Sequence, residues 1–173
     1  MEGASFSFIK SSSLRKKITE SIEFSVLLWT ASEGIETKYK DEIYRTIILY
    51  NIAIIEALLL LYTKQLKIKL PAEDCYTNSF SFPKYFQQMK DGEIVVSLRK
   101  KTEKVDSQIG LNDLIRVNKN YLGESLYKEV KSLNSIRNTF HLSKKRTNLS
   151  PSKEKSVSSF NTLLKIIEKM KKG

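Results

Sequence analysis

One stretch of twenty residues, Ile43–Tyr62, constrains the fold more than any other part of the chain. It reads IYRTIILYNIAIIEALLLLY and is long enough to cross a membrane. Arg45, Asn51 and Glu56 interrupt it, however, and a charged side chain at the bilayer centre costs about 2–3 kcal/mol. Because its apolar residues would lie on every side of a helix, the stretch favours a core helix that other helices surround over a membrane span.

The rest of the chain also favours helices. Six glycines and three prolines in 173 residues leave little for a turn-rich β-sandwich. Periodicity and capping signals predict helices over about 14–32, 40–66, 83–89, 112–120, 124–141 and 151–172. Ile94, Val96 and Leu98 alternate in the only predicted strand, which would turn back within residues 93–106 as a small β-hairpin, whereas 70–81 reads as a loop. We therefore expect one all-α domain over residues 1–173, a bundle of about five to six helices.

The positive charge lies almost entirely in the second half of the chain. Residues 1–86 hold 11 basic and 10 acidic side chains, and residues 87–173 hold 19 basic and 9 acidic, which together give the net charge of +11. One interpretation is a solvated, lysine-rich surface. The other is a polyanionic partner, either nucleic acid or an anionic membrane surface. The basic helix 151–172 is amphipathic, which keeps the membrane surface as an alternative.

Several site chemistries find no support in the composition. A single cysteine and a single histidine cannot build a disulfide framework or a Cys/His zinc site, and no glycine-rich phosphate loop occurs. We expect neither a metal nor a cofactor. Residues 1–10 lack the basic and apolar pattern of a signal peptide, so a cytoplasmic location is expected.

The segment 124–141, ESLYKEVKSLNSIRNTFH, carries an unusual apolar stripe. Leu126, Val130, Leu133, Ile136 and Phe140 define one face of the predicted helix. At 100° per residue, Arg137 falls roughly 20° from Leu126, in the middle of that face. His141 and Asn134 fall on its edge, and His141 is one helical turn beyond Arg137.

An arginine on a buried face must be paired or must line a polar cleft. In one interpretation Arg137 forms a structural salt bridge with Glu56 of the core helix, and His141 is a cation at a helix C-terminus. Glu56 could also pair with Arg45. In the other interpretation Arg137 grips a phosphate and His141 acts as acid or base in phosphodiester chemistry.

The string SIRNTFH and the string IEALLLLY resemble two helices of the HEPN superfamily (higher eukaryotes and prokaryotes nucleotide-binding). The family signature is an arginine, a polar residue and a following histidine, which Arg137, Asn138 and His141 match. Three residues separate Arg137 from His141, a shorter interval than is usual in the family. The resemblance covers about residues 40–66 and 107–146 and implies an up-and-down helical bundle.

The resemblance also implies a function. Many HEPN proteins are metal-independent endoribonucleases of toxin–antitoxin or phage-defence (abortive infection) systems, and they commonly form homodimers. It implies Arg137 and His141 as catalytic residues, supported by Asn138, Asn134 and Glu56. The partner would be RNA, with an antitoxin or effector protein as a further partner. The basic residues expected along the RNA path are Lys144, Lys145, Arg146, Arg99, Lys100 and Lys101. The alternative is a non-catalytic HEPN-like module that binds nucleotides, nucleic acid or a protein.

Overall fold

The computed structural model describes residues 6–70, 72–82, 94–140 and 150–172. Backbone contacts divide the chain into two compact units, one helical (Met1–Ile68 with Gly110–Gly173) and one containing the strands (Lys69–Ile109). The predicted strand therefore belongs to a unit separate from the helices.

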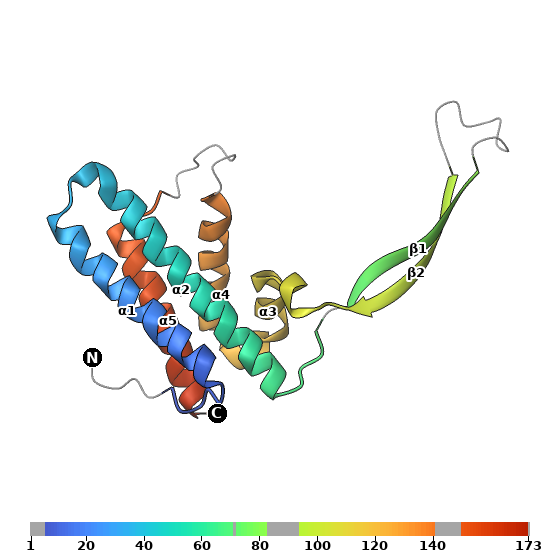
Figure 1. Ribbon diagram of the computed structural model, residues 1–173, viewed down its shortest axis with the longest axis horizontal. Helices are drawn as coiled ribbons and strands as arrows, with labels where there is room; N and C mark the ends of the chain where they lie inside the picture. Colours follow the sequence, from blue (N-terminus) through green and yellow to red (C-terminus); the bar gives the residue numbers. More distant parts are fainter. Residues whose placement is uncertain (1–5, 71, 83–93, 141–149, 173) are drawn as a thin grey trace. The chain divides into compact units, whose positions relative to one another are not determined.

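The described residues of the helical unit form a bundle of five α-helices (Figure 1). They are α1 (Ser12–Gly34), α2 (Thr37–Gln65), α3 (Leu111–Val117), α4 (Lys119–Thr139) and α5 (Lys153–Lys172). A short connection joins α1 to α2, and the two helices run antiparallel, side by side (Figure 1). Each of the other four helices packs against α2. The predicted all-α bundle is confirmed.

The apolar stretch of the sequence forms the centre of this bundle. Ten residues of α2 are buried, and Ile48, Ile55 and Leu58 have no exposed surface. By length and composition α2 could cross a membrane, but half of its most apolar window is buried within the protein. Since complete burial of an isoleucine or leucine contributes about 1.5–3 kcal/mol, α2 is the main source of packing energy in the helical unit.

Side-chain caps begin two of the helices. Ser11 lies just before α1 and accepts a hydrogen bond from the backbone N–H of Leu14 at 3.3 Å. At the start of α5 the hydroxyl oxygen of Ser152 accepts from the N–H of Lys155 at 3.3 Å. The helix predicted over 151–172 is therefore confirmed, with its start two residues later than predicted.

Gly123 breaks the regular geometry of α4. Its φ of 75° and ψ of 165° are non-helical, so the long helix that carries the apolar stripe begins after it, as predicted. This conformation is essentially restricted to glycine, because a Cβ would clash with the local backbone. The turn at Gly123 sets the direction in which the rest of α4 runs.

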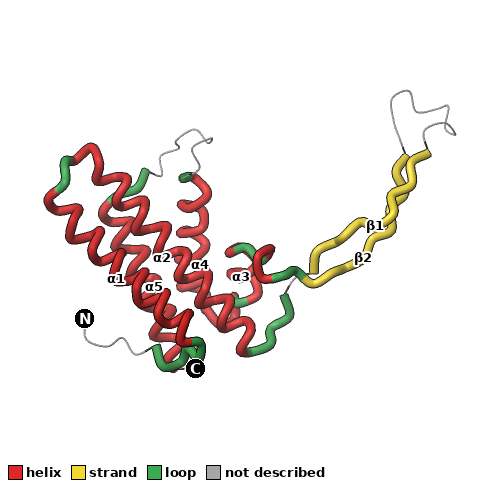
Figure 2. Tube along the Cα trace, viewed as in Figure 1, coloured by secondary structure: helices red, strands yellow, loops and turns green. Residues whose placement is uncertain are grey.

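The other unit contains two strands, β1 (Ala72–Phe82) and β2 (Ile94–Glu103), shown in yellow in Figure 2. They pair antiparallel from Ala72 opposite Glu103 to Phe82 opposite Ile94, with an irregularity between Thr77 and Ser79. The hairpin predicted within residues 93–106 pairs the wrong segments, because residues 101–103 continue β2 and do not form a returning strand. The returning strand is β1, predicted as a loop because polar residues occupy both alternating sets. The predicted helix 83–89 lies outside the described residues.

A carboxylate connects α4 to α5. Glu129 accepts hydrogen bonds from the Lys165 ammonium at 2.8 and 2.9 Å and from the Thr162 hydroxyl at 3.1 Å. The hydrogen bond from Lys165 is the main cause that lowers the pKa of Glu129, and Thr162 and Ser125 add to it. The charged form of Glu129 is therefore favoured in the folded protein.

We predict that this carboxylate contributes to the acid sensitivity of the fold. Because the folded-state pKa of Glu129 is depressed, its stabilisation is present above the unfolded-state pKa and is lost as pH falls through the folded-state pKa. Glu129→Gln should therefore flatten the acid limb of the stability–pH curve, measured by urea unfolding at a series of pH values. Equal slopes for Glu129→Gln and the wild type would contradict this assignment.

We also predict that Gly123→Ala destabilises the bundle. Forcing an alanine into this backbone conformation should lower the free energy of unfolding by about 1–3 kcal/mol. Gly34→Ala is the matched control, because Gly34 lies at the end of α1 and a Cβ there meets nothing within 4 Å. Its effect should stay within about 1 kcal/mol. Urea unfolding of both variants measures the difference, and equal effects would show that Gly123 is not strained.

Candidate functional site

The apolar stripe of α4 faces the core as predicted. Leu126, Val130, Leu133 and Ile136 are all buried, and Phe140, just beyond the last helical residue, is half-buried. The predicted 100° spacing holds over this segment because the irregular backbone is confined to Gly123. Arg137, expected in the middle of this face, lies at the C-terminal end of α4 with a side chain that is only partly buried.

Arg137 is paired and also accessible. Its guanidinium Nη1 lies 3.3 Å from Oε2 of Glu56 on α2, within hydrogen-bond distance. The Arg137 side chain is 41% exposed and that of Glu56 is 25% exposed. The predicted salt bridge between these two residues is therefore confirmed, and it leaves part of the guanidinium open to solvent. A guanidinium carries five N–H donors, so one carboxylate contact leaves donors for a ligand.

The open side of Arg137 faces a cleft of about 450 Å³. The cleft lies where the C-terminal end of α4 approaches the start of α3 and the middle of α2. Its lining residues are Leu49, Gly110, Leu111, Asn112, Asn134, Arg137, Asn138 and Phe140. One cation, three amides and an aromatic ring thus surround a single space, which suits an anionic ligand with a flat or apolar portion.

A hydrogen bond between two of these amides fixes both side chains. The Asn134 amide nitrogen donates to Oδ1 of Asn112 at 2.6 Å, and Asn134 is 6% exposed. This contact ties α4 to the N-terminal end of α3 and holds one wall of the cleft in place. Asn138 is exposed and lies one residue beyond Arg137, so its amide is available to a ligand. Asn134 and Asn138, both predicted as supporting residues, are therefore found at the cleft.

Arg45 supplies a second cation near the same end of α4. Its guanidinium lies 5.4 Å from the centre of the Phe140 ring, and it pairs with Glu42 at 3.0 Å. Glu56 therefore pairs with Arg137 and not with Arg45. Sequence reasoning did not include Asn112, Phe140 or Gly110 in the site. Nothing in the sequence pattern marked Asn112 or Gly110 as site residues, because only the packing of α3 against α4 brings them to the cleft.

The structure does not test the remaining predicted residues. His141, Lys144, Lys145 and Arg146 lie outside the described residues, and α4 ends at Thr139, two positions before His141. The structure places Arg99, Lys100 and Lys101 in β2, which belongs to the unit Lys69–Ile109. Their roles stay predictions. Among the residues that the structure describes, no group of three or more His, Cys, Asp or Glu side chains could hold a metal ion.

We predict that Arg137 contributes little to stability. A partly exposed ion pair is worth at most about 1 kcal/mol, so Arg137→Met should lower the free energy of unfolding by no more than that amount. Thermal and urea unfolding of Arg137→Met and Glu56→Gln provide the measurement. A loss of 3 kcal/mol or more, the order expected when a buried pair is broken, would show that the salt bridge is required by the fold.

Comparison with known proteins adds no family to this geometry. No family model matches the chain, and no curated protein or solved structure matches it either. The likeness of the two helices to HEPN proteins therefore stays a prediction, and the functional argument rests on the contacts of Arg137 and on the cleft beside it.

Proposed function

We propose that this protein is an HEPN-like RNA-binding protein whose Arg137 cleft holds a phosphate of the RNA backbone. The observation that carries the proposal is the position of Arg137, which is anchored by Glu56 at 3.3 Å and yet lines an open polar cleft. An anchored guanidinium loses little conformational freedom when it binds a phosphate, and its fork of donors matches phosphate oxygens. Lysines on a solvated surface lack both properties.

The charge distribution supports a polyanion at this site. Residues 110–173, which supply α3, α4 and α5, hold 14 basic and 5 acidic side chains, and thus +9 of the net +11. Clustered positive charge attracts nucleic acid over several ångströms and releases its counterions on binding. Phe140 and the three asparagines add what charge alone does not provide, namely a stacking surface and amides that can contact bases or ribose.

The proposal extends to metal-independent RNA cleavage. His141 is the only histidine of the chain and lies four residues beyond Arg137 in the sequence. With an imidazole at the cleft, His141 would move a proton to or from the ribose 2′-hydroxyl or the leaving oxygen, while Arg137 stabilises the charge on the phosphate. A homodimer would bring two such sites together. Within this proposal the chain is a cytoplasmic toxin or phage-defence ribonuclease with an antitoxin or effector partner.

A second candidate function is a non-catalytic module that binds nucleotides, nucleic acid or protein. One observation favours it: the Glu56 carboxylate partly neutralises Arg137. A guanidinium already paired with a carboxylate can still bind a phosphate but offers less charge to a transition state than an unpaired one. This candidate shares the phosphate site with the first and differs only in the absence of turnover.

Arg137→Ala tests both candidates. We expect it to weaken binding of a labelled single-stranded RNA at least tenfold and to reduce the slope of log K against log salt by about 0.7, since one phosphate contact is lost. Lys131→Ala is the matched control, because it removes the same charge from an exposed position of α4 outside the cleft. Its effect on affinity should stay below about twofold.

Cleavage is followed in the same samples with EDTA present. Loss of cleavage in Arg137→Ala and His141→Ala, with Lys131→Ala active, would support the ribonuclease. Binding that depends on Arg137 without any cleavage would support the non-catalytic module instead. Equal RNA affinity for Arg137→Ala and Lys131→Ala would contradict the phosphate site on which both candidates depend.

A further inference from the structure

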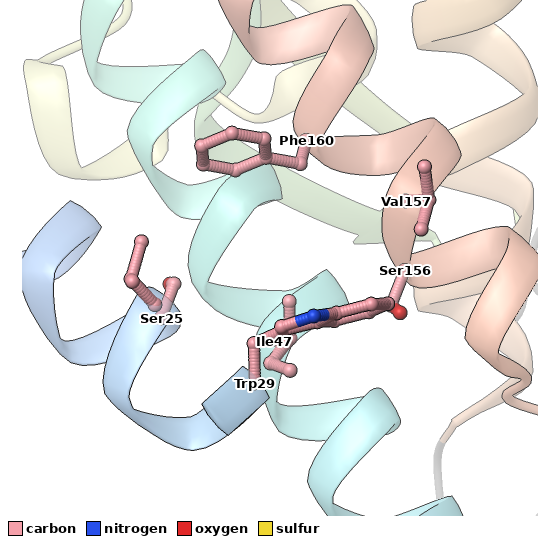
Figure 3. Close-up of a pocket in the computed structure, with 7 residues that line it drawn as sticks. Ser25, Trp29, Ile47, Ser156, Val157 and Phe160 are labelled. Carbon is pink, nitrogen blue, oxygen red and sulfur yellow. The ribbon is translucent and has the colours of Figure 1, made fainter. Parts of the chain in front are cut away.

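A second cavity, of about 180 Å³, lies among α1, α2 and α5 and opens to solvent beside Val157, which is exposed. Its lining residues are Ser25, Val26 and Trp29 of α1, Ile47 of α2, and Ser156, Val157 and Phe160 of α5. Figure 3 shows the rings of Trp29 and Phe160 on two sides of this space, with Val157 beside them. None of these residues lines the Arg137 cleft, so the cavity is a separate feature of the bundle.

The cavity exists because two of its wall positions are serines. Ser25 and Ser156 are 2% and 1% exposed, and their small side chains do not fill the space between the helices. Each hydroxyl donates to a carbonyl of its own helix, Ser25 to Ser21 at 3.0 Å and Ser156 to Lys153 at 2.8 Å. With their protons directed to the backbone, the serines offer no donor to a ligand, and the surface facing the cavity is almost entirely apolar.

The aromatic wall is held in position before any ligand arrives. The Trp29 ring packs against Tyr44 with a centroid distance of 6.1 Å, and the Lys153 ammonium lies 5.5 Å from the Trp29 ring centre. Both contacts restrict rotation of the indole. A wall that is already fixed lowers the entropy lost when a ligand binds.

We propose that this cavity is a binding site for a small, uncharged molecule with one apolar aromatic ring. An apolar cavity of roughly 150 Å³ is known to hold benzene in an engineered protein, so 180 Å³ admits a single ring with a small substituent but not a drug-sized ligand. Trp29 and Phe160 provide aromatic surfaces for that ring. A charged group placed against this lining would lose hydration without gaining a hydrogen bond, so the part of the ligand that enters the cavity should be uncharged.

Toluene is the probe for this site, and the chain carries its own reporter. Trp29 is the only tryptophan in the sequence and lines the cavity, so its emission reports occupancy directly. We expect toluene to change the Trp29 emission saturably and to raise the melting temperature of the full-length protein, whereas benzylammonium at equal concentration does neither, because it carries the same ring with a charge that the apolar lining does not solvate. A response to toluene that stays linear, without saturation or stabilisation, would overturn the proposal.

A substitution that fills the cavity should abolish toluene binding. Ser25→Leu places a larger side chain in the space and should weaken toluene binding at least tenfold, and Val26→Phe provides a second filling variant should the first fail to fold. Thr30→Leu is the matched control on an exposed position of the same helix, and it should bind toluene as the wild type does. Unchanged saturable binding in a folded filling variant would place the toluene elsewhere and overturn the assignment.

Discussion

The helical unit depends on the packing of four helices against α2. An apolar helix is stable in water when neighbouring helices cover most of its surface, and α1, α3, α4 and α5 all pack against α2. They bury ten of its residues and leave Leu49 and Tyr50 on an exposed face, so the cover expected on all sides of this helix is incomplete. Two polar residues of α2 form hydrogen bonds with polar side chains of those helices. Asn51 donates to Ser159 at 2.9 Å, and Glu56 accepts from Arg137. The core and the candidate site therefore share one helix.

This arrangement leaves Arg137 accessible to a ligand, and the partial exposure of its ion pair predicts a small contribution to stability. Glu56 lies on α2, against which the other four helices pack, so the backbone that carries the anchoring carboxylate is held in place. The pair nevertheless lies at the rim of the bundle, where Arg137 keeps 41% of its side chain exposed. Polar residues from α3 and α4 complete the cleft around it, while Arg45 holds Phe140 through its guanidinium.

Much of the fold and part of the site follow from the sequence, for identifiable reasons. Three features were predictable: the helix around Glu56, the turn at Gly123 and the buried face of α4. Each depends on the spacing of apolar residues or on the backbone conformation that a residue prefers, and both are local properties of the sequence. The salt bridge between Arg137 and Glu56 was predictable as one of two alternatives, because an arginine on an apolar face must either pair with a carboxylate or line a polar cleft. Strand β1 was missed because polar residues occupy both of its alternating sets, and Asn112 because only the packing of α3 brings it to α4.

The central claim is that phosphate binds beside Arg137, and nuclear magnetic resonance tests it most directly. Titration of the labelled protein with a short oligoribonucleotide would follow the side-chain Nε–H of Arg137 together with the side-chain amides of Asn138, Asn134 and Asn112. We predict that these signals shift together and saturate at one concentration. Shifts confined to the lysines of α5, with the Arg137 and asparagine signals unchanged, would show that RNA meets only a charged surface and would contradict the account.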